Sequence, residues 1–341
     1  MADPVRHRSH LTRVATPVNE RDLLLTTACG ACAPALPLAR GAARRLVHTR
    51  TRVTRLEPCA RAARESPVPV ALLSGPLASA AGMDRALGGL SHRLTSAGFT
   101  VGLVDLPGVG LAQALPAAWT LDDVIADVHD ALLRALAMAP VAIAHSSSAL
   151  VCQKYLESWS LQGLVMAAPL PPAPAATLAR WTGVPHPSAA DVGAFLTALA
   201  LDAPAAQRAL LAPDGGAAQQ HAALLMEDLD ALLAASSGAA RVEGAGQHPQ
   251  TRHLCGLAAT AKLLLDLAHS PVTLEPQPVP LLLLLPGRDA LVTREEAAAT
   301  QALHECAGDA EAVVAVPHAG HAVHYEPDVA ACIARWVERR F

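Results

Sequence analysis

The sequence is poor in charged residues, aromatic residues and lysine. Charged side chains make up 16% of the 341 residues and aromatic side chains 3%, and only Lys154 and Lys262 among the 26 basic residues are lysines. The apolar share is 52%, which excludes intrinsic disorder for the bulk of the chain, because disordered chains combine low hydrophobicity with high charge. The length predicts about two domains, or one large α/β domain with additions.

Long apolar runs and a regular cysteine pattern are also missing. The purest apolar run, 279–285, contains Pro280 and is far shorter than the about 18 residues that cross a bilayer, so we expect a soluble protein without a transmembrane helix. The 7 cysteines are scattered and odd in number, which argues against a disulfide framework. Cys29 and Cys32 lie in an arginine-rich stretch rather than between a strand and a helix, so we expect no redox or metal role for them.

Charge divides the chain into a basic head and an acidic body. Residues 1–66 hold 12 arginines and 5 acidic residues, whereas residues 67–341 hold 14 basic and 25 acidic residues. An acidic body argues against nucleic-acid binding. The head has no lysine and no sustained helical or alternating pattern, which is typical of a transit segment for a chloroplast or mitochondrion. A disordered extension of a cytoplasmic protein and a misannotated start are the alternatives.

The body alternates short apolar runs with helical patterns. Apolar runs bounded by Gly or Pro predict buried strands, and apolar residues at helical spacing predict the helices between them, one of them over 82–96. This alternation predicts an α/β fold, a mostly parallel sheet with helices on both faces. Only helical patterns occur between about 170 and 275, so we expect one domain over 67–341 with a helical cap inserted at the carboxyl edge of the sheet. Thr120, three residues before Asp123, predicts a capped helix start.

Three short motifs each follow a predicted strand. Ser146 lies in AHSSSALVCQKYLES, Asp289 lies in PGRDALV after the run PLLLLL, and His321 ends PHAGH after AVVAV. With these motifs, residues 67–341 resemble the α/β-hydrolase superfamily, and within it the lipase-like and lysophospholipase-like serine hydrolases. The resemblance implies that Ser146 is the nucleophile, Asp289 the acid and His321 the base, in the chain order of that fold.

The turn around the serine departs from the family pattern. The family usually has glycine two residues before and two residues after the nucleophile, where this chain has Ala144 and Ser148. Both residues are small, so the turn is feasible but more crowded. Taken alone, the motif also fits a strand-to-helix connection in which the serine is only a local cap.

These residue types suit acyl transfer. A serine hydroxyl becomes nucleophilic when a base removes its proton, which imidazole can do near neutral pH, and a carboxylate holds the imidazole tautomer. His318 and His324 are rival bases, and the glycine before His321 favours His321. Serine at position 146 excludes the aspartate-nucleophile mechanism of haloalkane dehalogenases and epoxide hydrolases. The three histidines lack the Cys or carboxylate partner set of a metal site.

The oxyanion loop departs further from the family. One donor is expected to be the backbone N–H of Ser147, and the second normally comes from the loop after the first core strand. That loop reads Ser74-Gly75-Pro76-Leu77, and proline has no N–H. We therefore expect the Leu77 N–H, or the hydroxyl of Ser74 or Ser147, to supply the second donor.

We predict a serine hydrolase that cleaves a carboxylic ester through an acyl-enzyme, on an apolar or lipid-like substrate. Ala144, Ser148 and Pro76 favour the alternative, a catalytically weak protein that binds a small apolar ligand in the same pocket. Acyl transfer to an acceptor other than water would use the same three residues. Asp105 in DLPGVG is expected to orient a turn, not to act as a second acid. No glycine-rich nucleotide loop is present, so nothing implies a cofactor. The sequence leaves the substrate and the oligomeric state open.

Overall fold

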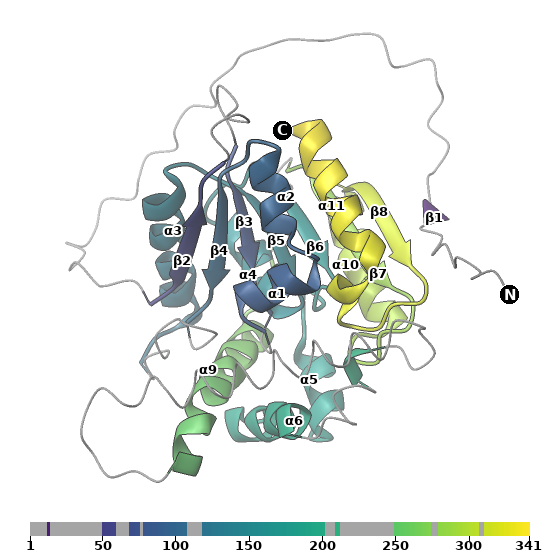
Figure 1. The fold of residues 1–341 in the computed structure, drawn as a ribbon. Helices are drawn as coiled ribbons and strands as arrows, with labels where there is room; N and C mark the ends of the chain where they lie inside the picture. Colours follow the sequence, from purple (N-terminus) through teal and green to yellow (C-terminus); the bar gives the residue numbers. More distant parts are fainter. Residues whose placement is uncertain are drawn as a thin grey trace, which may run out of the picture.

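An eight-stranded sheet with helices on both faces forms the framework of the protein (Figure 1). The computed structural model describes residues 12–13, 50–58, 68–75, 78–107, 118–201, 209–211, 249–273, 279–306 and 310–341. The strands are β1 (Thr12–Arg13), β2 (Arg52–Leu56), β3 (Val70–Leu73), β4 (Val101–Asp105), β5 (Val141–His145), β6 (Gly163–Ala167), β7 (Leu281–Pro286) and β8 (Ala310–Val316).

The sheet is mostly parallel. Its strand order is β1-β8-β7-β6-β5-β3-β4-β2, and every neighbouring pair is parallel except the two edge pairs, β1 with β8 and β2 with β4. The strands β3, β5 and β6 are buried along their whole length, as apolar strands covered on both faces must be. The predicted fold class, a mostly parallel sheet with helices on both faces, is confirmed.

Helices cover the two faces of the sheet. On one face, α1, α2 and α11 pack their apolar side chains against the strands, and Figure 1 shows α2 and α11 in front of the sheet. On the opposite face, α3 and α4 pack against the strands. The helices of the two layers are α1 (Ala80–Ala86), α2 (Leu90–Ser96), α3 (Leu121–Leu136), α4 (Ser147–Leu156), α10 (Arg294–Cys306), the short 3-10 turn η2 (Val323–Tyr325) and α11 (Pro327–Arg340).

Two helix predictions have different outcomes. The capped start of α3 is confirmed, because the Thr120 hydroxyl accepts from the Asp123 N–H and the Asp123 carboxylate accepts from the Thr120 N–H. The single helix over 82–96 is wrong, because the chain forms α1 and α2 instead. Gly88 and Gly89 separate the two helices with φ values of 63° and 76°, a left-handed conformation that interrupts a right-handed helix and that glycine adopts without a steric penalty.

The edge strand β2 corrects the predicted boundary of the domain. Residues 50–58 belong to the head that we assigned to an extension, yet β2 pairs antiparallel with β4 along its whole length. The Asp127 carboxylate on α3 also accepts from the N–H groups of Arg50 (2.9 and 3.1 Å) and Thr51 (2.6 Å). The sheet therefore includes residues before the predicted start at residue 67. The prediction that the head is a transit segment, or a disordered extension, otherwise concerns residues outside the described part of the chain, except for the two residues of β1.

The interval expected to form a cap is helical where the structure describes it. It contains α5 (Ala175–Thr182), α6 (Ala189–Leu201) and α9 (Pro249–His269), inserted between β6 and β7. Figure 1 shows these helices at the end of the sheet where the arrowheads of the parallel strands lie. Residues 202–208, 212–248 and 274–278 of the interval lie outside the described residues. In the described part of the chain, no helix is both long and apolar enough to cross a membrane.

Candidate active site

Ser146 lies on a sharp turn between β5 and α4. Its φ of 57° and ψ of −120° place it in a region that a residue with a Cβ adopts only when the surrounding structure enforces it. The enforcing contacts include the hydrogen bond from the Ser146 N–H to the carbonyl of Ala167 at the end of β6, 3.0 Å long. The buried serine side chain is thus presented at the carboxyl edge of the sheet.

Ser148 fits the turn in place of the usual glycine. Its hydroxyl, fully buried, accepts from the His145 N–H (3.0 Å) and lies within donating distance of the carbonyl oxygens of His145 (2.8 Å) and Leu73 (3.2 Å). Ala144, two residues before Ser146, is fully buried within β5. The larger side chains are therefore accommodated, and the Ser148 hydroxyl joins the turn to the end of β3.

The structure brings Ser146, His321 and Asp289 together in one hydrogen-bonded row. His321 Nε2 lies 2.8 Å from Ser146 Oγ, and His321 Nδ1 lies 2.8 Å from Asp289 Oδ2. Asp289 is in the loop after β7 and His321 in the loop after β8, so three parallel strands deliver the three side chains to one edge. Because the carboxylate accepts, Nδ1 carries the proton, and Nε2 is left to accept from the serine hydroxyl.

The carboxylate of Asp289 is held as an anion. Burial alone would raise its pKa, but the His321 imidazole beside it, together with hydrogen bonds from His321, Val292 and Leu291, keeps the pKa of Asp289 below its usual value. The N–H groups of Leu291 (2.8 Å) and Val292 (2.9 Å) both donate to Oδ1, which leaves Oδ2 for the imidazole. A buried, ionised carboxylate in this position can stabilise the imidazolium that forms when His321 takes a proton.

His145 is a second histidine of the site that we did not single out from the sequence. Its Nε2 lies 3.0 Å from the backbone oxygen of His321. Burial, aided by the neighbouring His321, lowers the pKa of His145 to about 3, so the ring is neutral near pH 7. Gly75 leaves room for it, because a Cβ at position 75 would stand 2.8 Å from His145 Nδ1.

The rival histidines are not hydrogen-bonded to Ser146. His318 is exposed on the loop after β8. His324 is buried and packs edge-on against His145, with ring centroids 4.3 Å apart. Of the three histidines in this loop, His321 alone reaches the serine hydroxyl in the described structure.

The predicted oxyanion donors are only partly described. Ser147 is the first residue of α4. A backbone N–H at this position has no partner within its own helix and lies at the positive end of the helix dipole. Leu77 and Pro76 lie outside the described residues. Ser74 is fully buried, its hydroxyl has no hydrogen-bond partner among the described residues, and it is not one of the described residues that line the cavity next to Ser146. Asp105 accepts from the Ala80 N–H at the start of α1 (2.7 Å), which agrees with a structural role.

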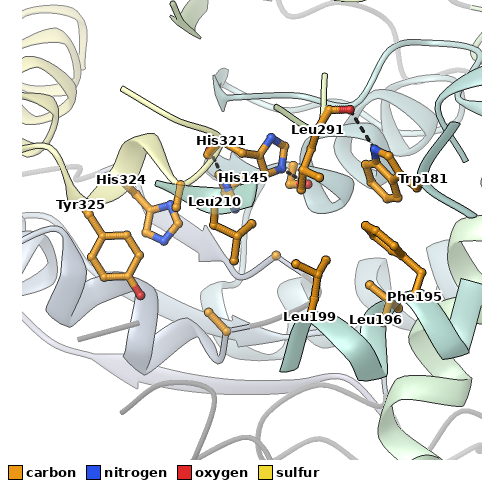
Figure 2. A pocket seen from close by; sticks show the side chains of 14 residues that line it. His145, Trp181, Phe195, Leu196, Leu199, Leu210, Leu291, His321, His324 and Tyr325 are labelled. Atoms are coloured by element: carbon orange, nitrogen blue, oxygen red, sulfur yellow. Dashed lines mark hydrogen bonds between the residues drawn. The ribbon is translucent and has the colours of Figure 1, made fainter. Parts of the chain in front are cut away.

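A small apolar cavity lies beside the serine (Figure 2). Its volume of about 40 Å³ is room for roughly three water molecules. Trp181 and Phe195 stack at a centroid distance of 5.3 Å and form one side. The described apolar side chains of the lining are those of Ala78, Trp181, Phe195, Leu196, Leu199, Leu210, Leu291, Ala322 and Tyr325.

The aromatic residues of this cavity were missed by the sequence analysis, although a signal existed. The chain has only 4 Trp, 2 Tyr and 3 Phe, and three of these nine, Trp181, Phe195 and Tyr325, line the cavity. Because aromatic residues are rare in this chain, their positions were a usable signal for the site. Among the described residues, no group of three or more His, Cys, Asp or Glu side chains is placed so that it could hold a metal ion.

Comparison with known proteins matches the fold. No protein-family model and no curated protein matches the sequence. Among solved structures, an esterase from Thermogutta terrifontis has a TM-score of 0.59 and 17% identity, covering 85% of this chain and 93% of that chain. An α/β-hydrolase enzyme from a Medee basin deep-sea metagenome library has a TM-score of 0.55 and 14% identity, covering 85% of this chain and 94% of that chain. The protein has the α/β-hydrolase fold.

A further solved structure is similar to this chain. An esterase from Exiguobacterium antarcticum has a TM-score of 0.58 and 15% identity, and the match covers 84% of this chain and 95% of that chain. These neighbours are esterases and hydrolases, and at such identities they show the fold of this chain. Identities this low leave the substrate and the site chemistry to be argued from the residues of this chain.

Proposed function

We propose that this protein is a serine hydrolase that cleaves a carboxylic ester of an apolar substrate, with Ser146, His321 and Asp289 as its catalytic triad. The observation that carries the proposal is the row of two hydrogen bonds, both 2.8 Å long, from Ser146 Oγ through His321 to Asp289 Oδ2. A structural serine cap would not need a buried imidazole and an ionised carboxylate behind it.

The proposed reaction has two acyl-transfer steps. Ser146 Oγ attacks the ester carbonyl carbon while His321 Nε2 takes the hydroxyl proton, and the C–O bond to the alcohol then breaks as His321 returns that proton to the leaving oxygen. Water next attacks the acyl-enzyme, giving a proton to His321, and the carboxylic acid leaves as Ser146 Oγ regains the proton. Asp289 stays ionised throughout and stabilises the imidazolium.

The negative charge on the carbonyl oxygen needs backbone donors. We propose the Ser147 N–H as one donor, because it lies at the N-terminus of α4, directly after the nucleophile. We propose the Leu77 N–H as the second, since Pro76 has none. Loss of one such donor costs about 10²–10³ in kcat, so the geometry of Leu77 decides how efficient the enzyme is.

The cavity favours a compact, uncharged acyl group next to the serine. Apart from Ser146 and the histidines, the nine described side chains that line the cavity are aliphatic or aromatic. His145, which also lines the cavity, is neutral near pH 7. The stacked rings of Trp181 and Phe195 form one side of the cavity, and its volume is about 40 Å³. A long lipid chain would therefore need these side chains to move, whereas a short acyl group would not.

The test is the hydrolysis of p-nitrophenyl esters of increasing acyl length. We expect kcat/KM to be highest for short acyl chains and to fall with length, and an initial burst of nitrophenol to report the acyl-enzyme. Phe195→Ala should move the maximum to longer chains, because it removes one wall of the cavity. Phe195→Leu is the matched control, since it keeps most of the volume.

Three results would contradict the proposal. Hydrolysis that persists in Ser146→Ala would assign the activity to another group. No hydrolysis of any ester, with an apolar ligand nevertheless bound, would favour a catalytically weak binding protein of this fold. Product that forms only with an added alcohol or amine acceptor would favour acyl transfer over hydrolysis.

A further inference from the structure

The first cap helix makes direct contact with the loop that carries Asp289. The backbone oxygen of Leu291 accepts three hydrogen bonds from α5: two from the guanidinium of Arg180, each 3.1 Å, and one from the indole N–H of Trp181, 2.8 Å. Figure 2 shows the Trp181 bond beside His321. Few backbone carbonyls receive three side-chain donors, so this peptide is held unusually tightly.

The same helix, α5, also binds the side chain of Glu296, which lies five residues after Leu291 in the sequence. The Glu296 carboxylate accepts from Thr177 Oγ1 (2.5 Å) and Arg180 Nη2 (2.5 Å), and also from the N–H of Thr293 (2.7 Å). Arg180 therefore joins the loop carbonyl and the start of α10 at once. An ion pair that shares donors with a backbone carbonyl fixes geometry better than an isolated surface pair.

Leu291 connects this clamp to the acid. Its N–H donates to Asp289 Oδ1 at 2.8 Å, while its carbonyl accepts from α5. The Leu291 carbonyl shares a peptide unit with the Val292 N–H, which also donates to Asp289 Oδ1 at 2.9 Å. A displacement of that carbonyl would therefore shift a donor that orients the carboxylate, and a shift of about 1 Å in a catalytic group can cost about 10²-fold in rate. The carboxylate must keep Oδ2 aimed at His321 Nδ1.

We propose that Arg180 and Trp181 are positioning residues, which hold Asp289 in register with His321 through the Leu291 carbonyl. The effect of this support on catalysis rests on the proposed function. It also gives the cap a role beyond covering the site: Trp181 lines the cavity and stacks on Phe195, so one side chain is both a wall of the acyl pocket and a support of the acid.

The test uses variants that remove donors and keep shape. Trp181→Phe keeps an aromatic ring against Phe195 but lacks the N–H, and Arg180→Met keeps the stem but lacks the guanidinium. Arg180→Lys can restore one donor. Arg93→Met is the matched control, because Arg93 also pairs with a glutamate, Glu338, on the surface (3.3 Å), but from α2 to α11.

The first readout separates positioning from substrate binding. In Arg180→Met we expect kcat to fall by roughly tenfold with KM changed less than about twofold, since Arg180 is not among the described residues that line the cavity and its lost contacts act on the acid. In Trp181→Phe with Arg180→Met we expect kcat to fall further, and KM to change as well, because Trp181 lines the cavity. Arg180→Lys should recover part of the loss. Arg93→Met should match the wild type. An unchanged kcat in the double variant of an active enzyme would overturn the inference.

The second readout does not need activity. Hydrogen exchange of the Leu291 and Val292 amides, which donate to Asp289, should become roughly tenfold faster in the double variant and stay unchanged in Arg93→Met. Faster exchange in a protein that hydrolyses no ester would support the clamp and overturn the proposed function. Unchanged exchange would overturn the clamp whatever the activity.

Discussion

His145 Nε2 lies 3.0 Å from the backbone oxygen of His321. A carbonyl only accepts, so the His145 ring donates, and its proton is on Nε2. The residue directly before the candidate nucleophile is thereby tied to the backbone of the candidate base. The ring is neutral near pH 7, because burial, aided by the neighbouring His321, lowers the pKa of His145 to about 3, although the bond to the His321 carbonyl raises it.

Stability should fall as the pH drops below about 6.5. His145, and also buried His304 with its pKa lowered to about 4, hold fewer protons in the folded state than in the unfolded state, where the pKa is about 6.5. Below that value the unfolded chain binds more protons, so the loss begins near pH 6.5 and continues towards pH 4. Each histidine should contribute about 2 kcal/mol of lost stability between pH 7 and pH 5.

Urea denaturation at several pH values measures this loss. His304→Gln should make the loss of stability between pH 7 and pH 5 about 2 kcal/mol smaller than in the wild type. If the stability of the wild type and of His304→Gln changed equally with pH, His304 would take up its proton over the same pH range in the folded and the unfolded protein.

Asp289→Asn should reduce kcat by about 10⁴-fold while the protein stays folded. An amide at this position no longer holds His321 with its proton on Nδ1 and no longer stabilises the imidazolium. Steady-state kinetics on the best ester measures the loss, with circular dichroism to check folding. Asp105→Asn, which alters another carboxylate at a strand end, should keep kcat within a few-fold. Equal activity of Asp289→Asn and wild type would contradict the assigned role.

Ser148→Gly should destabilise the protein, even though glycine is usual there in the family that the chain resembles. The variant loses the hydroxyl contacts with His145 and Leu73 and gains backbone freedom in the first turn of α4. We expect about 1–2 kcal/mol less stability, or a Tm lower by several degrees. Ser147→Gly controls for the backbone term. A higher Tm for Ser148→Gly would mean that the serine crowds the turn.

Asp127→Ala should weaken the attachment of β2. The N–H groups of Arg50 and Thr51 lose their partner, and we expect about 2 kcal/mol lower stability in urea denaturation. Asp122→Ala, an exposed residue on the same helix, is the control and should lose less than about 1 kcal/mol. Equal effects of the two variants would argue that residues 50–58 contribute little to the sheet.

The sequence predicts the parts of the site that follow apolar strands. Ser146, Asp289 and His321 each come within a few residues of the end of such a run. Parallel strands bring their carboxyl ends to one edge, which is why the structure joins residues as far as 175 positions apart. The buried strands themselves were visible because β3 and β6 contain only apolar residues and glycine, and β5 is apolar up to His145.

Contacts without a local pattern were not predictable. The bonds from Arg180 and Trp181 to Leu291 span about 110 positions, and no periodicity announces them. The strand β2 was missed because an edge strand with mostly exposed side chains lacks an apolar run. The break at Gly88 and Gly89 was readable, since two consecutive glycines favour a left-handed turn over a continued helix.

Covalent labelling of Ser146 tests the central claim most directly. The wild-type protein is treated with a fluorophosphonate, and mass spectrometry locates the adduct. A hydrolase built on Ser146, His321 and Asp289 predicts one phosphonyl group per chain, on Ser146, and none in Ser146→Ala. A wild type that takes no label, or label that persists in Ser146→Ala but is lost in Ser147→Ala or Ser148→Ala, would contradict it.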